Sequence, residues 1–183
     1  MHLPRRVANN LFWRLVHCAC NRGARQRKRR TSSLIRAFGE KVLDLAGQGL
    51  SHGPAHSAVG QEGGAVGSAM AMRGSDQING SHRAHHQFLA KALAYVTPEG
   101  INPEQSFGET LRTLSKRTLS EILGLSEGFC QGRGGSMHLR WAESGNLGTN
   151  AIVGGGVPMA AFLGLTVWYL GDSFNNLYGS KVI

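Results

Sequence analysis

The distribution of glycine constrains this chain more than any other feature of its sequence. The 26 glycines do not form a linker-like tract but occur in short runs beside histidine and arginine, as in 132–135 and 154–156. Because glycine lacks a Cβ atom, such runs let the backbone turn sharply and approach a ligand closely. The chain has 41% apolar and 17% charged residues. That composition supplies a hydrophobic core and excludes a wholly disordered protein.

The positive charge of the chain is concentrated at its beginning. The formal net charge is +9, yet residues 1–33 hold nine basic residues and no acidic ones, which leaves residues 34–183 electrically balanced. We therefore predict a basic, disordered extension (1–33) and a folded domain (34–183). The extension fits an organelle presequence, a nucleic-acid-binding arm or translated upstream sequence that does not fold.

Apolar periodicity and turn residues predict alternating helices and short strands. The predicted helices run from the N-cap pair Ser32-Ser33 to Leu50, over 60–72, through 88–93 up to Thr97-Pro98, and from the capping-box pattern Thr118–Glu121 to Leu125. Strands are predicted at 76–81 and 151–153, a polar loop at 98–110, and a further helix with Pro158 in its first turn. This alternation indicates an α/β layer architecture.

Two other features concern the environment of the chain. Residues 145–170 carry no charge and are long enough for a membrane span, but three consecutive glycines and Pro158 favour a strand, a glycine turn and a helix. Three cysteines are too few for a disulfide framework, which favours a reducing compartment.

Two histidine-rich segments are candidates for chemistry. Gly53-Pro54 prevents His56 from sharing a helix with His52, so His56 is predicted in a loop before a helix. In the second segment, three histidines at i, i+3 and i+4 lie on one face if the segment is helical (His82, His85, His86). Arg83 stands among them and opposes a cation, so an anionic ligand fits better than zinc. A capping or core role remains the alternative for any single histidine.

Two glycine-rich segments follow. Consecutive backbone N–H groups of Gly132–His138 are suited to an anion-binding nest, with a flexible turn as the alternative. The segment lacks the ending of a P-loop and the dinucleotide fingerprint. Asn150–Pro158 has the pattern of a strand that runs through a glycine turn into a helix, a common way to hold phosphate or a flat heterocycle.

Together, in this order and spacing, the segments resemble a known family. HSAVGQE (56–62), GSHRAHHQFLA (80–90), GRGGSMH (132–138) and NAIVGGGVP (150–158) are similar to the alpha subunit of the decarboxylating component of thiamine-diphosphate-dependent 2-oxo acid dehydrogenases. That family covers the pyruvate, branched-chain 2-oxo acid and acetoin enzymes. The resemblance runs from about Leu34 to Ala161 and implies part of a thiamine-diphosphate-binding fold, a parallel sheet flanked by helices.

The resemblance also implies roles for single residues. His56 matches the active-site histidine near the reacting thiazolium, and His85 matches the histidine of its own motif; both are implied to be catalytic. Arg83 matches the arginine that grips the diphosphate, and His82 stands where many members have tyrosine. Ala151 and Val153 fall on positions whose backbone lines the aminopyrimidine.

The sequence departs most from the family pattern at the position of the magnesium motif. The family has Gly-Asp-Gly followed by a distal asparagine, whereas the candidate here is Gly171-Asp172-Ser173, with Asn175 and Asn176 too close to replace that distal ligand. Asp172 is therefore the predicted ligand of Mg²⁺ and of the cofactor, in a site without its second protein ligand. From Phe162 onward the sequence departs from the family, and we expect a truncated chain with an altered tail.

The function implied is oxidative decarboxylation of a 2-oxo acid of the pyruvate type, with acyl transfer to a lipoyl group. The expected partners are a beta subunit, which supplies the carboxylate that activates the cofactor, and a lipoyl-bearing acyltransferase; this chain alone is expected to be inactive. The alternatives are a nucleic-acid-binding module that uses the basic arm, and a histidine-rich metallohydrolase. The expected location is the cytoplasm of a bacterium, or the mitochondrial matrix if residues 1–33 are a presequence.

Overall fold

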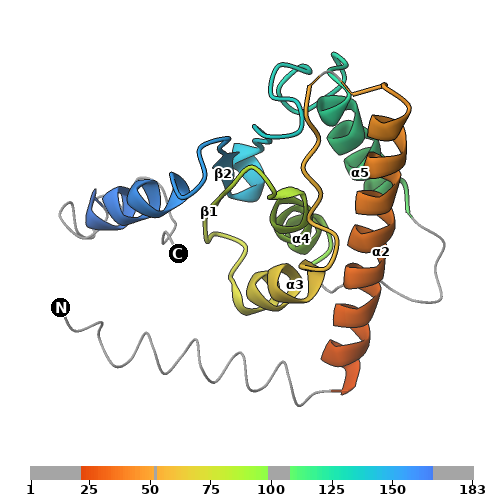
Figure 1. Ribbon diagram of the computed structural model, residues 1–183. Coiled ribbons are helices and arrows are strands. Elements are labelled where there is room, and N and C mark those ends of the chain that lie inside the picture. Colours follow the sequence, from red (N-terminus) through yellow and green to blue (C-terminus); the bar gives the residue numbers. More distant parts are fainter. Residues whose placement is uncertain (1–21, 52, 99–107, 167–183) are drawn as a thin grey trace.

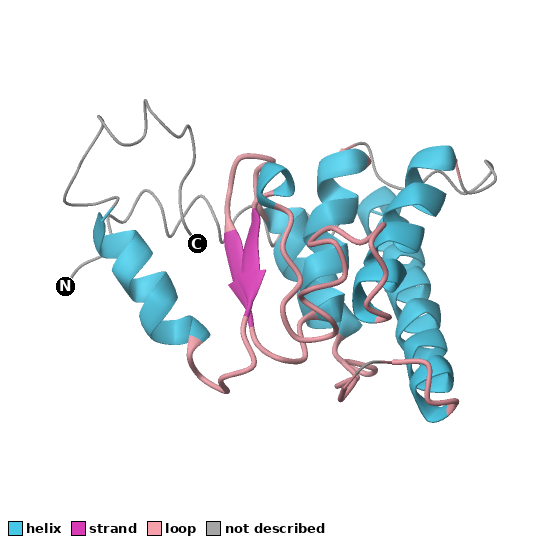
Figure 2. Ribbon diagram, turned by 90° about the horizontal axis from the view of Figure 1, so that it is seen from above, coloured by secondary structure: helices cyan, strands magenta, loops and turns pink. Residues whose placement is uncertain are grey.

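A computed structural model describes residues 22–51, 53–98 and 108–166 of the chain. Four helices pack on one side of a small sheet: α2 (Arg22–Gly47), α3 (Glu62–Ala71), α4 (His85–Val96) and α5 (Glu109–Ile122). The strands are β1 (Ile78–Gly80) and β2 (Asn146–Thr149), with the 3-10 turn η1 (Ala142–Ser144) before β2. A further helix over residues 156–166 lies on the other side of the strands (Figures 1 and 2).

The two strands run parallel, and this fixes where the segments that follow them lie. Gly80 at the end of β1 pairs with Thr149 at the end of β2, and the register shifts by one residue between Ile78 and Asn79. In a parallel sheet both strands end at one edge, so the segments after β1 and β2 meet there. The predicted α/β class is confirmed in this form, as a small parallel sheet flanked by helices.

Helix α4 lies at the centre of the hydrophobic core. Phe88 and Leu93 on this helix are 1% and 3% exposed, and α4 contacts α2, α3, α5 and both strands. Val42 of α2, Val66 of α3 and Leu114 of α5 pack around it. A helix with apolar residues on several sides is expected to be enclosed by its neighbours, and α4 is enclosed in this way.

Several predicted elements are confirmed. The helix predicted at 60–72 is α3, the strand predicted at 76–81 is β1, and the helix predicted to end before Thr97-Pro98 is α4. Pro158 lies in the first turn of the helix over 156–166, where its missing N–H group costs no hydrogen bond. Within the described ranges, no helix combines the length and the apolar character that a membrane span needs.

Two predicted elements are wrong. Residues 151–153 form a turn and not a strand, because the Asn150 side chain accepts a hydrogen bond from the Ile152 N–H group (2.9 Å) and bends the chain just after β2. No helix begins at Thr118. Helix α5 begins at Glu109, inside the predicted polar loop, and the Thr118 hydroxyl donates to the Leu114 carbonyl one turn earlier (2.8 Å).

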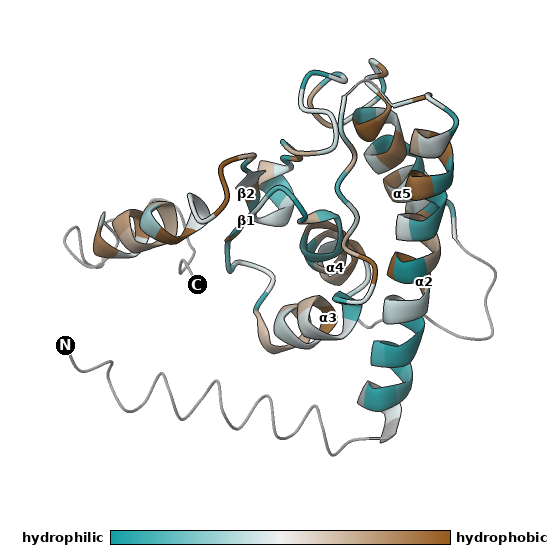
Figure 3. Ribbon diagram, viewed as in Figure 1, coloured by the Kyte–Doolittle hydropathy of each residue, from teal (hydrophilic) through white to brown (hydrophobic). Residues whose placement is uncertain are grey.

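The predicted start of the first helix at Ser32-Ser33 is also wrong. Helix α2 begins at Arg22, and the Ser33 hydroxyl donates to the Arg29 carbonyl within the helix (2.9 Å) instead of capping it. Arginine, lysine and glutamine are good helix formers, which explains why this basic stretch is helical. The proposed boundary between residues 33 and 34 therefore falls inside α2, whose first half is the hydrophilic part of that helix in Figure 3.

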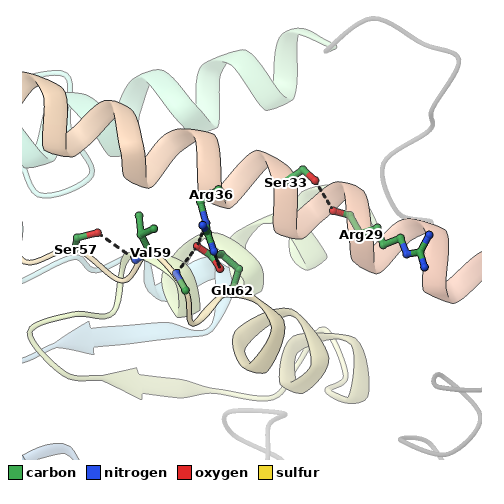
Figure 4. A network of polar contacts seen from close by, with 7 residues as sticks. Arg29, Ser33, Arg36, Ser57, Val59 and Glu62 are labelled. Carbon is green, nitrogen blue, oxygen red and sulfur yellow. Dashed lines mark hydrogen bonds and ion pairs between the residues drawn. The ribbon is translucent and has the colours of Figure 1, made fainter.

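An ion pair fixes α2 to the first residue of α3. Arg36 donates to both carboxylate oxygens of Glu62, from Nε to Oε1 (2.7 Å) and from one terminal nitrogen to Oε2 (3.0 Å) (Figure 4). The Gly60 N–H group donates to Oε1 of the same carboxylate (2.9 Å). The Glu62 side chain is 7% exposed, and the hydrogen bond from Arg36 is the largest cause that lowers its pKa from 4.5 to about 2.

This ion pair predicts a defined pH dependence of stability. A carboxyl group whose pKa is lower in the folded state stabilises that state above its unfolded pKa, and loses this contribution as the pH falls. We expect the Glu62 contribution to be complete above about pH 4.5 and to disappear toward about pH 2. Urea denaturation of the wild type and of Glu62→Gln should give free energies of unfolding whose difference shrinks across this window. A difference that stays constant from pH 7 to pH 2 would contradict the prediction.

Candidate functional site

His56 lies in the loop held by the Arg36–Glu62 ion pair. This loop precedes α3, and the Ser57 hydroxyl accepts a hydrogen bond from the Val59 N–H group (3.1 Å), which makes a tight turn directly after His56 (Figure 4). The His56 imidazole is partly exposed and contacts the His82 ring edge to face, with the ring centroids 5.0 Å apart. The prediction of a loop histidine before a helix is confirmed.

His82 and Arg83 occupy the turn between β1 and α4. Helix α4 begins only at His85, so the prediction that His82 shares a helical face with His85 and His86 is wrong. The N–H group of Arg83 donates weakly to the Ser81 hydroxyl (3.4 Å), which closes the turn before the helix can start. Arg83 is exposed, and among the described residues its guanidinium group forms no ion pair.

The beginning of α4 is suited to an anion. The N-cap residue is Ala84, which forms no side-chain capping bond, and the first turn contains no acidic residue. The N–H groups at a helix start carry a partial positive charge and need acceptors. With Arg83 directly before the helix, this end of α4 combines a full positive charge with backbone donors.

His85 is buried against the glycine-rich loop. His85 is 2% exposed. Its Nε2 atom lies 2.8 Å from the carbonyl oxygen and 2.9 Å from the hydroxyl of Ser136. Burial lowers the pKa of His85, while the contact with Ser136 opposes this shift. Burial also lowers the pKa of the adjacent His86. Both rings are therefore neutral at pH 7, and His85 offers a hydrogen-bonding group rather than a cation.

Three imidazole nitrogens in this segment have no partner. The Nδ1 atoms of His82, His85 and His86 are buried and accept or donate no hydrogen bond within the described part of the chain. Most buried polar atoms in folded proteins are hydrogen-bonded, so each exception needs an explanation. Three such atoms within five residues mark this segment as a place where a ligand would be bonded.

The predicted anion nest is already filled by the protein itself. The carboxylate of Glu121, at the end of α5, is fully buried and accepts three backbone N–H groups of the loop 128–135. Its oxygens accept from Cys130 (2.6 Å), Gly132 (3.0 Å) and Gly134 (2.7 Å). The prediction of an external anion at this loop is therefore wrong, although the nest geometry that motivated it is present.

Aromatic contacts hold the same loop against α4. The Phe129 ring packs edge to face on Phe88 of α4 (5.6 Å between centroids) and stacks on Trp141 (4.8 Å). The guanidinium of Arg117 lies over the Phe129 ring, 4.2 Å from its centroid. The glycine loop is therefore fixed from both sides, by Glu121 and by these rings, and is not a flexible turn.

Ala151 and Val153 lie in the turn that follows β2. The N–H group of Asn150 donates to the Gly80 carbonyl (3.0 Å), and the Asn79 side chain donates to the Gly156 carbonyl (2.9 Å). These bonds attach the turn to the end of β1, beside His82 and Arg83. The turn and the helix after it carry exposed apolar side chains: Ile152 (68%), Val153 (74%), Val157 (73%) and Phe162 (70%).

All four motif segments therefore meet in one region. Segment 56–62 contacts segment 80–90 through His56 and His82, and segment 80–90 contacts segment 132–138 through His85 and Ser136. Segment 150–158 joins segment 80–90 through Asn150 and Gly80. Thr149, directly before it, exchanges hydrogen bonds with Leu139, directly after segment 132–138. The region lies at the edge where the parallel strands end, the usual position of ligands in α/β folds.

Asp172, the predicted ligand of magnesium and cofactor, lies outside the described residues and stays a prediction. Within the residues that the structure does describe, no group of three or more His, Cys, Asp or Glu side chains is arranged to hold a metal ion. The histidine segment thus offers no described zinc site, and the metallohydrolase alternative gains no support from it.

Sequence reasoning missed Glu121, Ser136 and Arg36. The capping-box pattern explains Glu121 locally, and the nearer acid Glu127 stands directly before the glycine-rich segment, so the sequence does not single out Glu121 as its partner. Ser136 stands inside a motif but is a residue type with many possible partners. Arg36 lies 26 residues from Glu62, and a pairing at that separation has no local signature.

Comparisons with known proteins agree on one family. The chain is 34% identical over 152 residues to the alpha subunit of acetoin:2,6-dichlorophenolindophenol oxidoreductase from Bacillus subtilis, a match that covers 78% of this chain and 40% of the relative. It is 34% identical over 140 residues to the alpha subunit of the pyruvate dehydrogenase E1 component from Zymomonas mobilis, covering 76% of this chain and 34% of the relative. The Cupriavidus necator acetoin protein is 31% identical, with coverage of 79% and 37%. No protein-family profile matches the chain.

The close packing of the glycine loop predicts unequal effects of two alanine substitutions. Gly132 and Gly135 both have positive φ angles (75° and 59°), but a Cβ atom on Gly132 would lie 2.5 Å from the Gly124 backbone, whereas one on Gly135 would meet no atom within 4 Å. Gly135→Ala should cost about 1–2 kcal/mol from the backbone conformation alone. Gly132→Ala should cost about 1–3 kcal/mol more, from overpacking. Urea denaturation measures both, and equal losses would contradict the assigned packing.

Proposed function

We propose a function from one premise, that the chain belongs to the alpha-subunit family of the pyruvate and acetoin dehydrogenases, which it matches over about three quarters of its sequence. The chain spans 34–40% of the length of these relatives. In the complete assembly, its residues would form the diphosphate side of a thiamine diphosphate site. The reaction would be oxidative decarboxylation of a 2-oxo acid of the pyruvate type, with acyl transfer to a lipoyl group.

The observation that carries the proposal is the meeting of the four motif segments at the carboxyl edge of the sheet. Direct contacts join them: His56 with His82, His85 with Ser136, and Asn150 with Gly80. Segments up to 94 residues apart in the chain thus meet at the edge where α/β folds usually bind their ligands. The partial thiamine-diphosphate-binding fold is part of this proposal.

The described residues fit such a cofactor. The start of α4 offers backbone donors without a side-chain cap or an acidic residue in its first turn, and Arg83 beside it has no competing ion pair among the described residues. A diphosphate needs this combination of positive charge and N–H groups. The unpartnered Nδ1 atom of His82 is a further site for a bond to the ligand. The turn with Ala151 and Val153 presents backbone and apolar atoms to a flat ring.

When bound, thiamine diphosphate would supply the electron sink for decarboxylation. Arg83 would bind and orient the diphosphate, while His56 and His85 would hydrogen-bond the substrate carboxylate and the oxygen on which charge develops. Since burial lowers the pKa of His85, it would act as a neutral group at pH 7. The covering of His85 by the Ser136 loop would keep water away from this side of the site.

The remaining components belong to the same proposal. Mg²⁺ would be held with the help of Asp172, a beta subunit would provide the activating carboxylate, and a lipoyl-bearing acyltransferase would accept the acyl group. A cytoplasmic or mitochondrial location also stays a prediction.

The experiment is titration calorimetry of thiamine diphosphate, with Mg²⁺, into the chain co-purified with a beta subunit of the family. Arg83→Ala should weaken binding by about 10- to 100-fold, because a charge-assisted bond to phosphate is worth about 1.5–3 kcal/mol. Arg27→Ala, which removes an exposed arginine of α2, is the matched control and should leave the affinity unchanged. Equal affinity of the wild type and Arg83→Ala would contradict the role of Arg83, and absence of binding by the wild-type complex would contradict the proposed function.

A further inference from the structure

The contact between His85 and Ser136 determines which imidazole nitrogen of His85 carries hydrogen. Nε2 lies 2.8 Å from the Ser136 carbonyl oxygen. A carbonyl oxygen can only accept a hydrogen bond, so Nε2 must be the donor. The Ser136 hydroxyl, 2.9 Å from the same nitrogen, can adapt to this arrangement because its hydrogen rotates.

The charge state of His85 follows from its surroundings. Burial lowers its pKa, and the nearby His86 and His56 act in the same direction, while the bond to Ser136 acts against them. A neutral ring with hydrogen on Nε2 has a lone pair on Nδ1. That Nδ1 atom is buried, and as an acceptor it receives no hydrogen bond from any of the described residues.

The position of the Ser136 carbonyl depends on the Glu121 carboxylate. Oε1 of Glu121 accepts from the Gly134 N–H group, two residues before Ser136, and Oε2 accepts from Cys130 and Gly132. The Gly134 carbonyl in turn accepts from the His138 N–H group (3.2 Å), two residues after Ser136. Ser136 therefore lies inside a short loop, 134–138, which is closed by this backbone bond and is tied to the Glu121 carboxylate at its first residue.

We propose that Glu121 is a positioning residue of the active site, which fixes the Ser136 carbonyl against His85 and so leaves Nδ1 of His85 as an unpartnered acceptor. The catalytic meaning of this acceptor rests on the proposed function; the coupling between Glu121 and the His85 tautomer does not. Glu121 touches no part of the proposed substrate site and acts only through the loop.

Only a carboxylate can accept all three loop N–H groups, and an amide cannot replace it. The loop presents three N–H donors, and the two oxygens of a carboxylate are both acceptors. In Glu121→Gln one oxygen becomes an NH₂ group, which would face a backbone N–H donor instead of an acceptor. At least one of the three loop bonds must then break, and the Ser136 carbonyl loses its fixed position.

The experiment is ¹⁵N–¹H NMR spectroscopy of histidine-labelled full-length chain, since the nitrogen shifts of an imidazole report its tautomer and its titration directly. In the wild type, His85 should be neutral at pH 7 with hydrogen on Nε2. In Glu121→Gln, the two tautomers should become mixed and the pKa of His85 should fall further, because the bond to Ser136 that opposes the lowering is weakened. Ser136→Ala is the matched control: it removes the hydroxyl but keeps the carbonyl, so the Nε2–H tautomer should persist.

A purely structural role of Glu121 would lower stability without changing His85. A folded Glu121→Gln protein whose His85 keeps its tautomer and pKa would therefore overturn the proposal, as would a wild type with hydrogen on Nδ1. If Glu121→Gln does not fold, Glu121→Asp decides by the same spectra, because its shorter side chain keeps the charge but cannot reach all three N–H groups. A shift of tautomer and pKa in Glu121→Asp supports the proposal, and unchanged spectra overturn it.

These spectra are independent of the cofactor. Calorimetry of thiamine diphosphate on the wild-type complex with a beta subunit is run in parallel. Failure of that binding would contradict the proposed function while leaving the coupling between Glu121 and His85 intact. Unchanged His85 spectra in the Glu121 variants would contradict the coupling while leaving cofactor binding intact.

Discussion

The buried Glu121 carboxylate is the interaction on which the site region depends. A charge inside a protein is costly unless hydrogen bonds replace its hydration, and three loop N–H groups do so here. The loop must come very close to supply them: a Cβ atom on Gly128 would lie 2.2 Å from a Glu121 oxygen, and one on Gly134 would lie 2.2 Å from the His138 carbonyl. Gly128 is therefore required by an internal carboxylate and Gly134 by the close approach of His138, although the glycine pattern of this loop first suggests an external ligand.

The position of α4 connects this loop to the remainder of the site. The helix is buried in the core and begins at the edge where both strands end, so the core holds its first residues in place. His85 is held from the loop side by Ser136, and the neighbouring turn is held to the end of β2 through Gly80 and Asn150. The His56 loop is attached from the other direction by the ion pair between Arg36 and Glu62. Side chains from four separate segments thus rest on one core helix and one sheet edge.

Local patterns predicted much of this arrangement, and the errors have specific physical causes. Helices α3 and α4 and strand β1 follow from apolar spacing and turn residues, which act over a few positions. The start of α2 is not predictable in this way, because a run of arginines indicates charge more obviously than helix propensity. The capping-box pattern at Thr118 misleads, because the Thr118 hydroxyl bonds back to Leu114. The meeting of the four segments was implied by the family resemblance. The partner of the glycine loop was not predictable, because Glu121 pairs with residues 9 to 13 positions away through tertiary structure.

The exposed apolar side chains after β2 have a consequence for the dielectric environment of the site. Ile152, Val153, Val157 and Phe162 are each more than two-thirds exposed, and the first three belong to one of the four converging segments. Uncovered, they leave this edge of the sheet in contact with water, whose high dielectric constant weakens ionic interactions there. Any surface that covers them would exclude this water and strengthen the attraction between Arg83 and a bound anion. Strong binding of an anion at this edge is therefore expected only when another surface covers these apolar side chains. The chain supplies the positive charge, and the covering surface would lower the dielectric constant around it.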